Sequence, residues 1–191
     1  MKSAFGILQQ IARTMHIACL ALASGVIVAT GVAAAIAFPT MRDLAPSLPG
    51  LSQVDDNWMI AAGAVMAKVF AVTGGIAATA IAISALALVI EAFTAQRRRP
   101  VPLMGRSLVL LLLVSVCAHY TAVLLPTMNH TFDAFVVAAR ANELDQAATL
   151  RAEFESMHPV ASRELGAIAF LSLIAALLGA WPVSRQAVTD S

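Results

Sequence analysis

A long run of uncharged and mostly apolar residues, from Ser107 to His130, constrains this chain more than any other feature. The run reads SLVLLLLVSVCAHYTAVLLPTMNH and contains no Asp, Glu, Lys or Arg. More than about 18 such residues in a row is the length that a helix needs to cross a bilayer. The run therefore predicts a membrane-spanning helix that carries His119 at membrane depth, where an imidazole needs a hydrogen-bond partner or a function.

The composition of the whole chain also favours a membrane protein. Of its 191 residues, 60% are hydrophobic and 12% are charged, which is far too apolar for an ordinary soluble domain. A net charge of +1 provides no basic field, so nucleic acid is not expected as a partner. The two cysteines, Cys19 and Cys117, both lie in apolar runs, which favours buried free thiols over a disulfide.

Three further apolar segments complete a prediction of four membrane-spanning helices. The first segment is about twice as long as a signal-peptide core, so we expect a retained helix that ends at Phe38–Pro39. The second can run unbroken from Trp58 to Phe93 and exceeds the bilayer thickness, so part of it is expected to stand outside. The predicted spans are 14–38, 69–92, 107–128 and 163–181, in a single membrane domain over residues 1–191.

Residues 131–158, between the third and fourth spans, carry a helical pattern of mixed polarity. Pro126 is expected to kink or end the third helix, and Asn142 with Asp145 to cap a restarted one. An apolar stripe follows at helical spacing, formed by Ala147, Leu150, Phe154 and Met157. The fold class we expect is therefore an all-α integral membrane protein, an up-down bundle of four transmembrane helices with an extra amphipathic helical cap.

Positive charge gathers in one short segment. Arg97, Arg98 and Arg99 stand together, and Arg106 follows shortly after. Basic residues in short loops mark the cytoplasmic side of a membrane protein. The pattern predicts that both termini and this turn are cytoplasmic, and the alanine-rich composition favours a bacterial inner membrane.

Small residues recur in the first two spans at helical spacing. Gly25 and Ala29 belong to the first span, and Gly74 and Ala78 to the second. Small side chains let helices approach closely in a bilayer. They predict packing faces for another helix of this chain, for other membrane subunits or for a second copy.

Histidines and methionines near the predicted outer end form a candidate metal or haem site. Imidazole and thioether groups suit copper, and haem iron accepts both as axial ligands. His16 lies near the opposite face and is not expected to join them. No strict ligand spacing such as H-E-x-x-H is present, so interfacial histidines without a cofactor are the competing interpretation. The set is His119, Met128, His130, Met157 and His158.

Lys68 is the charged residue nearest to the apolar part of the second helix. It is interpreted either as a side chain that snorkels from the end of a span or as part of an ion or proton relay. A relay needs an acidic partner, for which Asp55, Asp56 and Glu164 are the candidates.

Several short segments together resemble the transmembrane protein 205-like family, a four-span group with a largely unassigned role. They are MHIACLALASG, AFPTM, AAGAVMAKVF, LLPTM and RAEFESMHPVAS. The last resembles the family's pattern of an aromatic, a histidine and a small polar residue, here Phe154, His158 and Ser162. The pattern around His16 more distantly resembles copper-resistance membrane proteins and a haem-pathway oxidase, which implies metal or haem chemistry at His16.

Catalytic motifs are lacking in the sequence: no Ser-His-Asp set, phosphate-binding loop or paired-carboxylate pocket can be identified. We therefore expect a non-enzymatic structural or interaction subunit, or a small homo-oligomer, that binds no cofactor. The alternative is a metal- or haem-binding membrane protein that uses the outer His/Met set. A third hypothesis is a small transporter, although broken helices and mid-span charges are missing.

Overall fold

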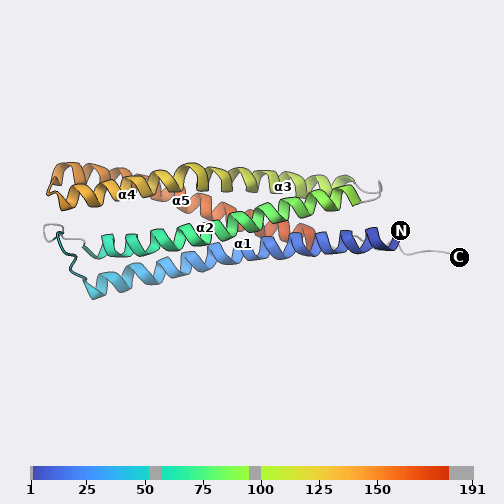
Figure 1. The fold of residues 1–191 in the computed structure, drawn as a ribbon, viewed down its shortest axis with the longest axis horizontal. Helices are drawn as coiled ribbons and strands as arrows, with labels where there is room; N and C mark the ends of the chain where they lie inside the picture. Colours follow the sequence, from blue (N-terminus) through green and yellow to red (C-terminus); the bar gives the residue numbers. More distant parts are fainter. Residues whose placement is uncertain (1, 52–56, 95–99, 181–191) are drawn as a thin grey trace.

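The chain is all-helical over the residues that the computed structural model describes, namely 2–51, 57–94 and 100–180 (Figure 1). Some predictions fall outside these residues. They concern Asp55 and Asp56 as relay partners, the arginine turn at 97–99, and residue 181 at the end of the fourth predicted span. The helices are α1 (Lys2–Leu44), α2 (Asn57–Thr94), α3 (Pro100–His119), the π-helical turn η1 (Tyr120–Leu124), α4 (Leu125–Arg140) and α5 (Leu144–Ala180).

Four long apolar helices are confirmed. By length and composition, each of the stretches Phe5–Leu44, Asn57–Thr94, Leu103–Arg140 and Leu144–Ala180 is able to cross a membrane. The third stretch comprises α3, η1 and α4, which form one continuous rod. At about 1.5 Å per residue each rod is some 55 Å or more in length, against about 30 Å for a hydrocarbon core.

Contacts between the helices differ along the molecule. The helix α1 packs against α2 and α5, α3 packs against α2 and α5, and α4 packs mainly against α5. In Figure 1 the α1–α2 connection and the α4–α5 turn lie together at one end, which we call the loop end. We call the opposite end, near Arg13, Glu91, Arg106 and Gly179, the terminal end.

Three prolines are accommodated within helical segments, including the two that were expected to interrupt a helix, Pro39 and Pro126. The prediction that the first helix ends at Phe38–Pro39 is wrong, because α1 continues through Pro39 to Leu44. Pro159 lies inside α5, and Pro126 follows directly on the π-helical turn. The three proline rings are exposed, so each points away from the core. A wider π-turn also relieves the clash that a proline ring makes with the carbonyl four residues earlier.

The expected separate cap over residues 131–158 is replaced by extensions of two long helices. Residues up to Arg140 belong to α4, and residues from Leu144 belong to α5. Asn142 does not cap the second helix as predicted. It adopts a left-handed conformation with φ of 60° directly after α4, where Asn is tolerated better than most residues. The loop end is therefore a hairpin of two long helices.

The predicted packing residues occupy different environments. An added Cβ at Gly25 or Gly74 would meet no atom within 4 Å, although Gly74 is buried. Ala29 is exposed, whereas Ala78 packs against the main core. The close approaches occur elsewhere, at Gly179 and Gly63. An added Cβ would lie 3.0 Å from Ile17 at Gly179 and 2.9 Å from Phe132 at Gly63.

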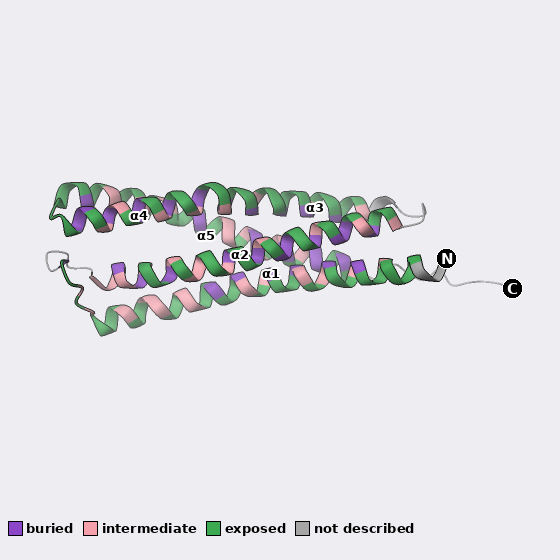
Figure 2. Cartoon of the chain, in the orientation of Figure 1, coloured by how far each residue is buried: buried purple, intermediate pink, exposed green. Residues whose placement is uncertain are grey.

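Two hydrophobic clusters form the interior. The main cluster lies between all four rods and includes Leu20, Ile81, Leu113 and Ile168. A second, smaller cluster lies at the loop end, around Leu51, Ile60, Phe132, Phe135 and Ala147. Much of the remaining helix surface is exposed (Figure 2), and many of the exposed side chains are large and apolar. Such a surface suits a hydrocarbon surrounding better than water.

Candidate functional site

A cavity of about 440 Å³ is lined by residues of both hydrophobic clusters. It is partly open, and its walls come from α1, α2, η1, α4 and α5. Pockets of 300–1,000 Å³ with mainly apolar walls and a few polar groups are the usual form of small-molecule sites. The cavity is therefore the first candidate for a functional site.

Aromatic and methionine side chains make up most of the apolar wall. Phe132 packs on Phe135 and Phe154, with ring centroids 6.3 Å and 5.3 Å apart. The Phe132 ring also reaches Gly63 on α2, so a larger residue at position 63 would displace it. Methionine is flexible and adapts to irregular ligands. The remaining aromatic and methionine residues of the wall are Phe38, Trp58, Met59, Met66, Phe70 and Met128.

Neutral polar groups lie among these apolar side chains. Tyr120 of η1, Asn129 of α4, and His158 and Ser162 of α5 all line the cavity. Their side chains make no hydrogen bond to another described residue. Because Tyr120 is only 3% exposed, its hydroxyl group belongs to the interior. These groups are therefore free to bind a ligand.

A single charged pair also lines the cavity among the described residues. Arg151 Nε donates a hydrogen bond to Glu155 Oε1 at 2.8 Å, one helical turn further along α5. The side chains of these residues are 33% and 50% exposed, so the pair lies at the wet edge of the cavity. It contributes no net charge there.

His119 and Glu164 form a second polar feature beside the cavity. His119 Nδ1 lies 2.7 Å from Glu164 Oε1, which joins α3 to α5. The second carboxylate oxygen of Glu164 is buried without a hydrogen-bond partner among the described residues. Lys68 is exposed and forms no ion pair with a described residue. Glu164, one of the acidic partners predicted for a relay with Lys68, is paired with His119.

The candidate metal ligands are divided among different environments. His158 and Met128 line the cavity, whereas His119 pairs with Glu164 and His130 is exposed. Met157 is partly buried against the main core. Among the described residues, no group of three or more His, Cys, Asp or Glu side chains is arranged to hold a metal ion.

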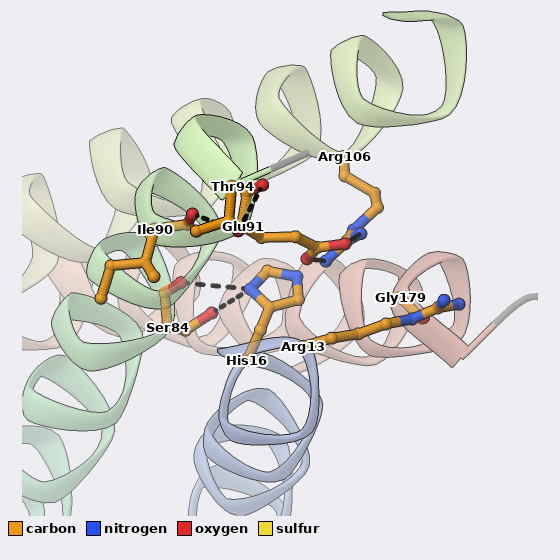
Figure 3. A network of polar contacts seen from close by, with 8 residues as sticks. All are labelled: Arg13, His16, Ser84, Ile90, Glu91, Thr94, Arg106 and Gly179. Atoms are coloured by element: carbon orange, nitrogen blue, oxygen red, sulfur yellow. Dashed lines mark hydrogen bonds and ion pairs between the residues drawn. The ribbon is translucent and has the colours of Figure 1, made fainter. Parts of the chain in front are cut away.

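A buried polar cluster occupies the terminal end (Figure 3), and none of its residues is among those that line the cavity. Arg106 of α3 donates two hydrogen bonds to the Glu91 carboxylate of α2, at 2.9 Å and 2.7 Å. The two residues are 5% and 7% exposed. A two-pronged pair of this kind is among the strongest polar contacts in proteins. It fixes the α2–α3 hairpin.

His16 of α1 joins the same cluster. It is fully buried, with Nδ1 2.8 Å from the Ser84 hydroxyl and 3.2 Å from the Ser84 carbonyl oxygen. The other ring nitrogen has no hydrogen-bond partner in the part of the chain that the structure describes, and it points toward the Glu91–Arg106 pair in Figure 3. Arg13 Nε donates to the Gly179 carbonyl at 2.7 Å, which adds α5. All four rods are thus tied together at this end.

Sequence reasoning missed several of these features. Glu91 lies at the end of the predicted span 69–92, and Arg106 was interpreted only as a topology signal. Both lie a few residues from the predicted turn between the second and third spans. Two opposite charges at the same predicted depth on consecutive helices could have indicated this ion pair. No comparable pattern could have indicated a role for Tyr120 or Asn129, because a single polar residue in an apolar helix is usually structural.

Comparisons with protein-family models, with curated proteins and with solved structures find no match to this chain. The resemblance to the transmembrane protein 205-like family therefore stays a prediction.

We predict that Glu91→Gln destabilises the protein, because it leaves the buried Arg106 guanidinium without its counter-charge. The loss should be about 3–5 kcal/mol, visible as a lower midpoint of thermal unfolding in detergent by circular dichroism. The double variant Glu91→Gln/Arg106→Met should recover most of it. Glu155→Gln, which breaks an exposed pair, serves as control and should cost about 1 kcal/mol or less. Equal midpoints for Glu91→Gln and the unmodified protein would contradict this role.

Proposed function

We propose that this chain is an integral protein of a bacterial inner membrane, an up-down bundle of four transmembrane helices with cytoplasmic termini. Support comes from the four apolar rods and from the charges at their ends. Basic residues Arg13 and Arg106 lie at the terminal end, next to the arginine turn of the sequence. The positive-inside bias is counted in Lys and Arg, and the arginine turn is the densest basic cluster of the sequence. The basic residues at the loop end, among them Arg42, Arg140 and Arg151, are spread over longer segments that also carry acidic residues.

The charge-free part of α2 supports a position for the bilayer. It extends from Val69 to Ile90, about 33 Å at 1.5 Å per residue, which matches a hydrocarbon core of about 30 Å. Lys68 then lies at the outer boundary and Glu91 at the inner one. The loop end protrudes from the membrane in this arrangement.

We further propose that the protein binds an amphipathic molecule in the cavity and does so without catalysing a reaction. The cavity itself is the observation that carries this proposal. Its α2 wall extends from Trp58 to Phe70, so it starts outside the proposed bilayer position and ends within it. A molecule with a polar and an apolar part suits such a site. The bound molecule would be presented to, or received from, other membrane subunits or a second copy.

The proposed orientation predicts a labelling pattern for single-cysteine variants. In a background with Cys19 and Cys117 replaced, a cysteine at Ser47 or Ala141 should react with a membrane-impermeant maleimide on intact spheroplasts. A cysteine at Gly6 should react only after the membrane is permeabilised. Labelling of Gly6→Cys on intact spheroplasts would overturn the orientation.

Ligand binding can be tested by photo-crosslinking in nanodiscs. The probes are an oleoyl monoglyceride and an oleic acid, mixed in equal amounts, each with a diazirine in the chain. We expect label on cavity-lining peptides that excess unlabelled lipid abolishes. Ala67→Phe, which fills the cavity, should reduce that label about tenfold, as expected for a clash worth ~1.4 kcal/mol.

The control for this experiment is Ala64→Phe. Ala64 lies one turn from Ala67 on the same helix but is exposed and does not line the cavity. Its competable label should equal that of the unmodified protein. Label that excess lipid fails to displace, or an equal loss in both variants, would contradict ligand binding in the cavity.

Haem binding is a second candidate, and one observation favours it. The cavity brings His158 together with Met59, Met66 and Met128, and His and Met are both axial ligands of haem iron. Protein purified gently from membranes should then show a Soret band that His158→Ala removes. A spectrum without visible absorption, from cells with sufficient haem, counts against this candidate.

A further inference from the structure

The neutral polar groups of the cavity indicate which polar head group a bound amphipathic ligand would have. Tyr120, Asn129, His158 and Ser162 come from η1, α4 and α5. None is engaged in a side-chain hydrogen bond with another described residue. Tyr120 is buried and Asn129 is half-buried, whereas His158 and Ser162 are exposed. A polar group that is unpaired and withdrawn from water is unfavourable, so a ligand that pairs it gains affinity.

The four groups offer donors and acceptors in nearly equal measure. Hydroxyl groups of Tyr and Ser donate and accept, the Asn amide does both through separate atoms, and a neutral imidazole does both through its two nitrogens. His158 is held in place by Phe154, whose ring centroid is 4.6 Å away in an edge-to-face arrangement. Hydroxyl and carbonyl oxygens are the ligand groups that such a mixed set recognises.

Net charge is absent from the described part of the cavity wall. Arg151 and Glu155 are its charged members, and they pair with each other at 2.8 Å. A phosphate or carboxylate head would lose its hydration without gaining a counter-charge of its own. Burial of an unpaired ion is far more costly than burial of a neutral polar group.

From these observations we infer that the ligand is an uncharged amphipathic lipid whose head carries hydroxyl or carbonyl oxygens. This inference rests on the proposed ligand-binding function and narrows it. Asn129, His158 and Ser162 hold the head. Tyr120, nine residues and about 13 Å before Asn129 on the same rod, lies beside the apolar part together with Met66, Phe70 and Leu165. Monoacylglycerols and isoprenoid alcohols have the required chemistry, whereas fatty acids and phospholipids do not.

The test compares the two diazirine probes separately, at alkaline pH where the fatty acid is ionised. They share one chain and differ only in the head, so their difference reports on head recognition. We expect the concentration for half-maximal competable label to be about tenfold lower for the monoglyceride than for the fatty acid. One or two neutral hydrogen bonds account for a ratio of this size.

A double variant, Asn129→Leu/Ser162→Ala, removes two of the head-binding groups while keeping the cavity apolar. It should weaken monoglyceride labelling about tenfold and leave fatty-acid labelling unchanged. Thr127→Val is the matched control, because Thr127 lies on the same helix as Asn129 but is exposed and does not line the cavity. An unchanged thermal unfolding midpoint shows that the double variant is folded.

Two results overturn the inference while leaving the proposed function intact. One is competable fatty-acid labelling as strong as that of the monoglyceride. The other is a folded double variant that labels like the unmodified protein with both probes. Absence of competable label with either probe, in the unmodified protein, instead defeats the proposed function, and the inference with it.

Discussion

The length of the helices relative to a bilayer governs the arrangement of this molecule. Each rod is nearly twice as long as a hydrocarbon core is thick, so one half of the bundle stands outside the membrane in the proposed topology. Inside hydrocarbon, helix association gains little from burial of apolar surface. Outside it, apolar faces must be covered. The phenylalanine cluster around Phe132, Phe135 and Phe154 does this at the loop end.

The π-helical turn lies within the third rod, where Tyr120 lines the cavity. It starts at Tyr120 and is followed by Pro126, and its wider spacing accommodates a proline that would distort a regular helix. The extra residue in the turn also changes which side chains face inward afterwards. Tyr120 and Leu124 are buried, and Met128 and Phe132 follow them at four-residue spacing on the same side. The turn thus serves both the continuity of the rod and the shape of the cavity.

Hydropathy was sufficient to predict the number of long helices, because apolar length is a property of each segment alone. The bounds of α2 agree with the sequence to within one residue at each end. Proline was a poor guide to helix ends, since its cost depends on whether the ring faces outward, as at Pro39 and Pro159. The cavity could not be predicted, because it depends on how far two helix pairs separate. Asn129 and Ser162 are candidate ligand-binding residues only because that separation leaves a cavity beside them.

The two ends of the molecule are held in different ways, and this difference bears on ligand entry. At the terminal end, buried polar contacts among Arg13, His16, Glu91 and Arg106 connect all four rods. At the loop end, α4 packs mainly on α5 and meets α2 and the α1–α2 connection through apolar side chains of the second cluster, without a buried polar contact among the described residues. Regions joined by few contacts open at lower free-energy cost than the rest of a fold. A bundle clamped at one end can therefore widen at the other, where the cavity lies, without losing its overall arrangement.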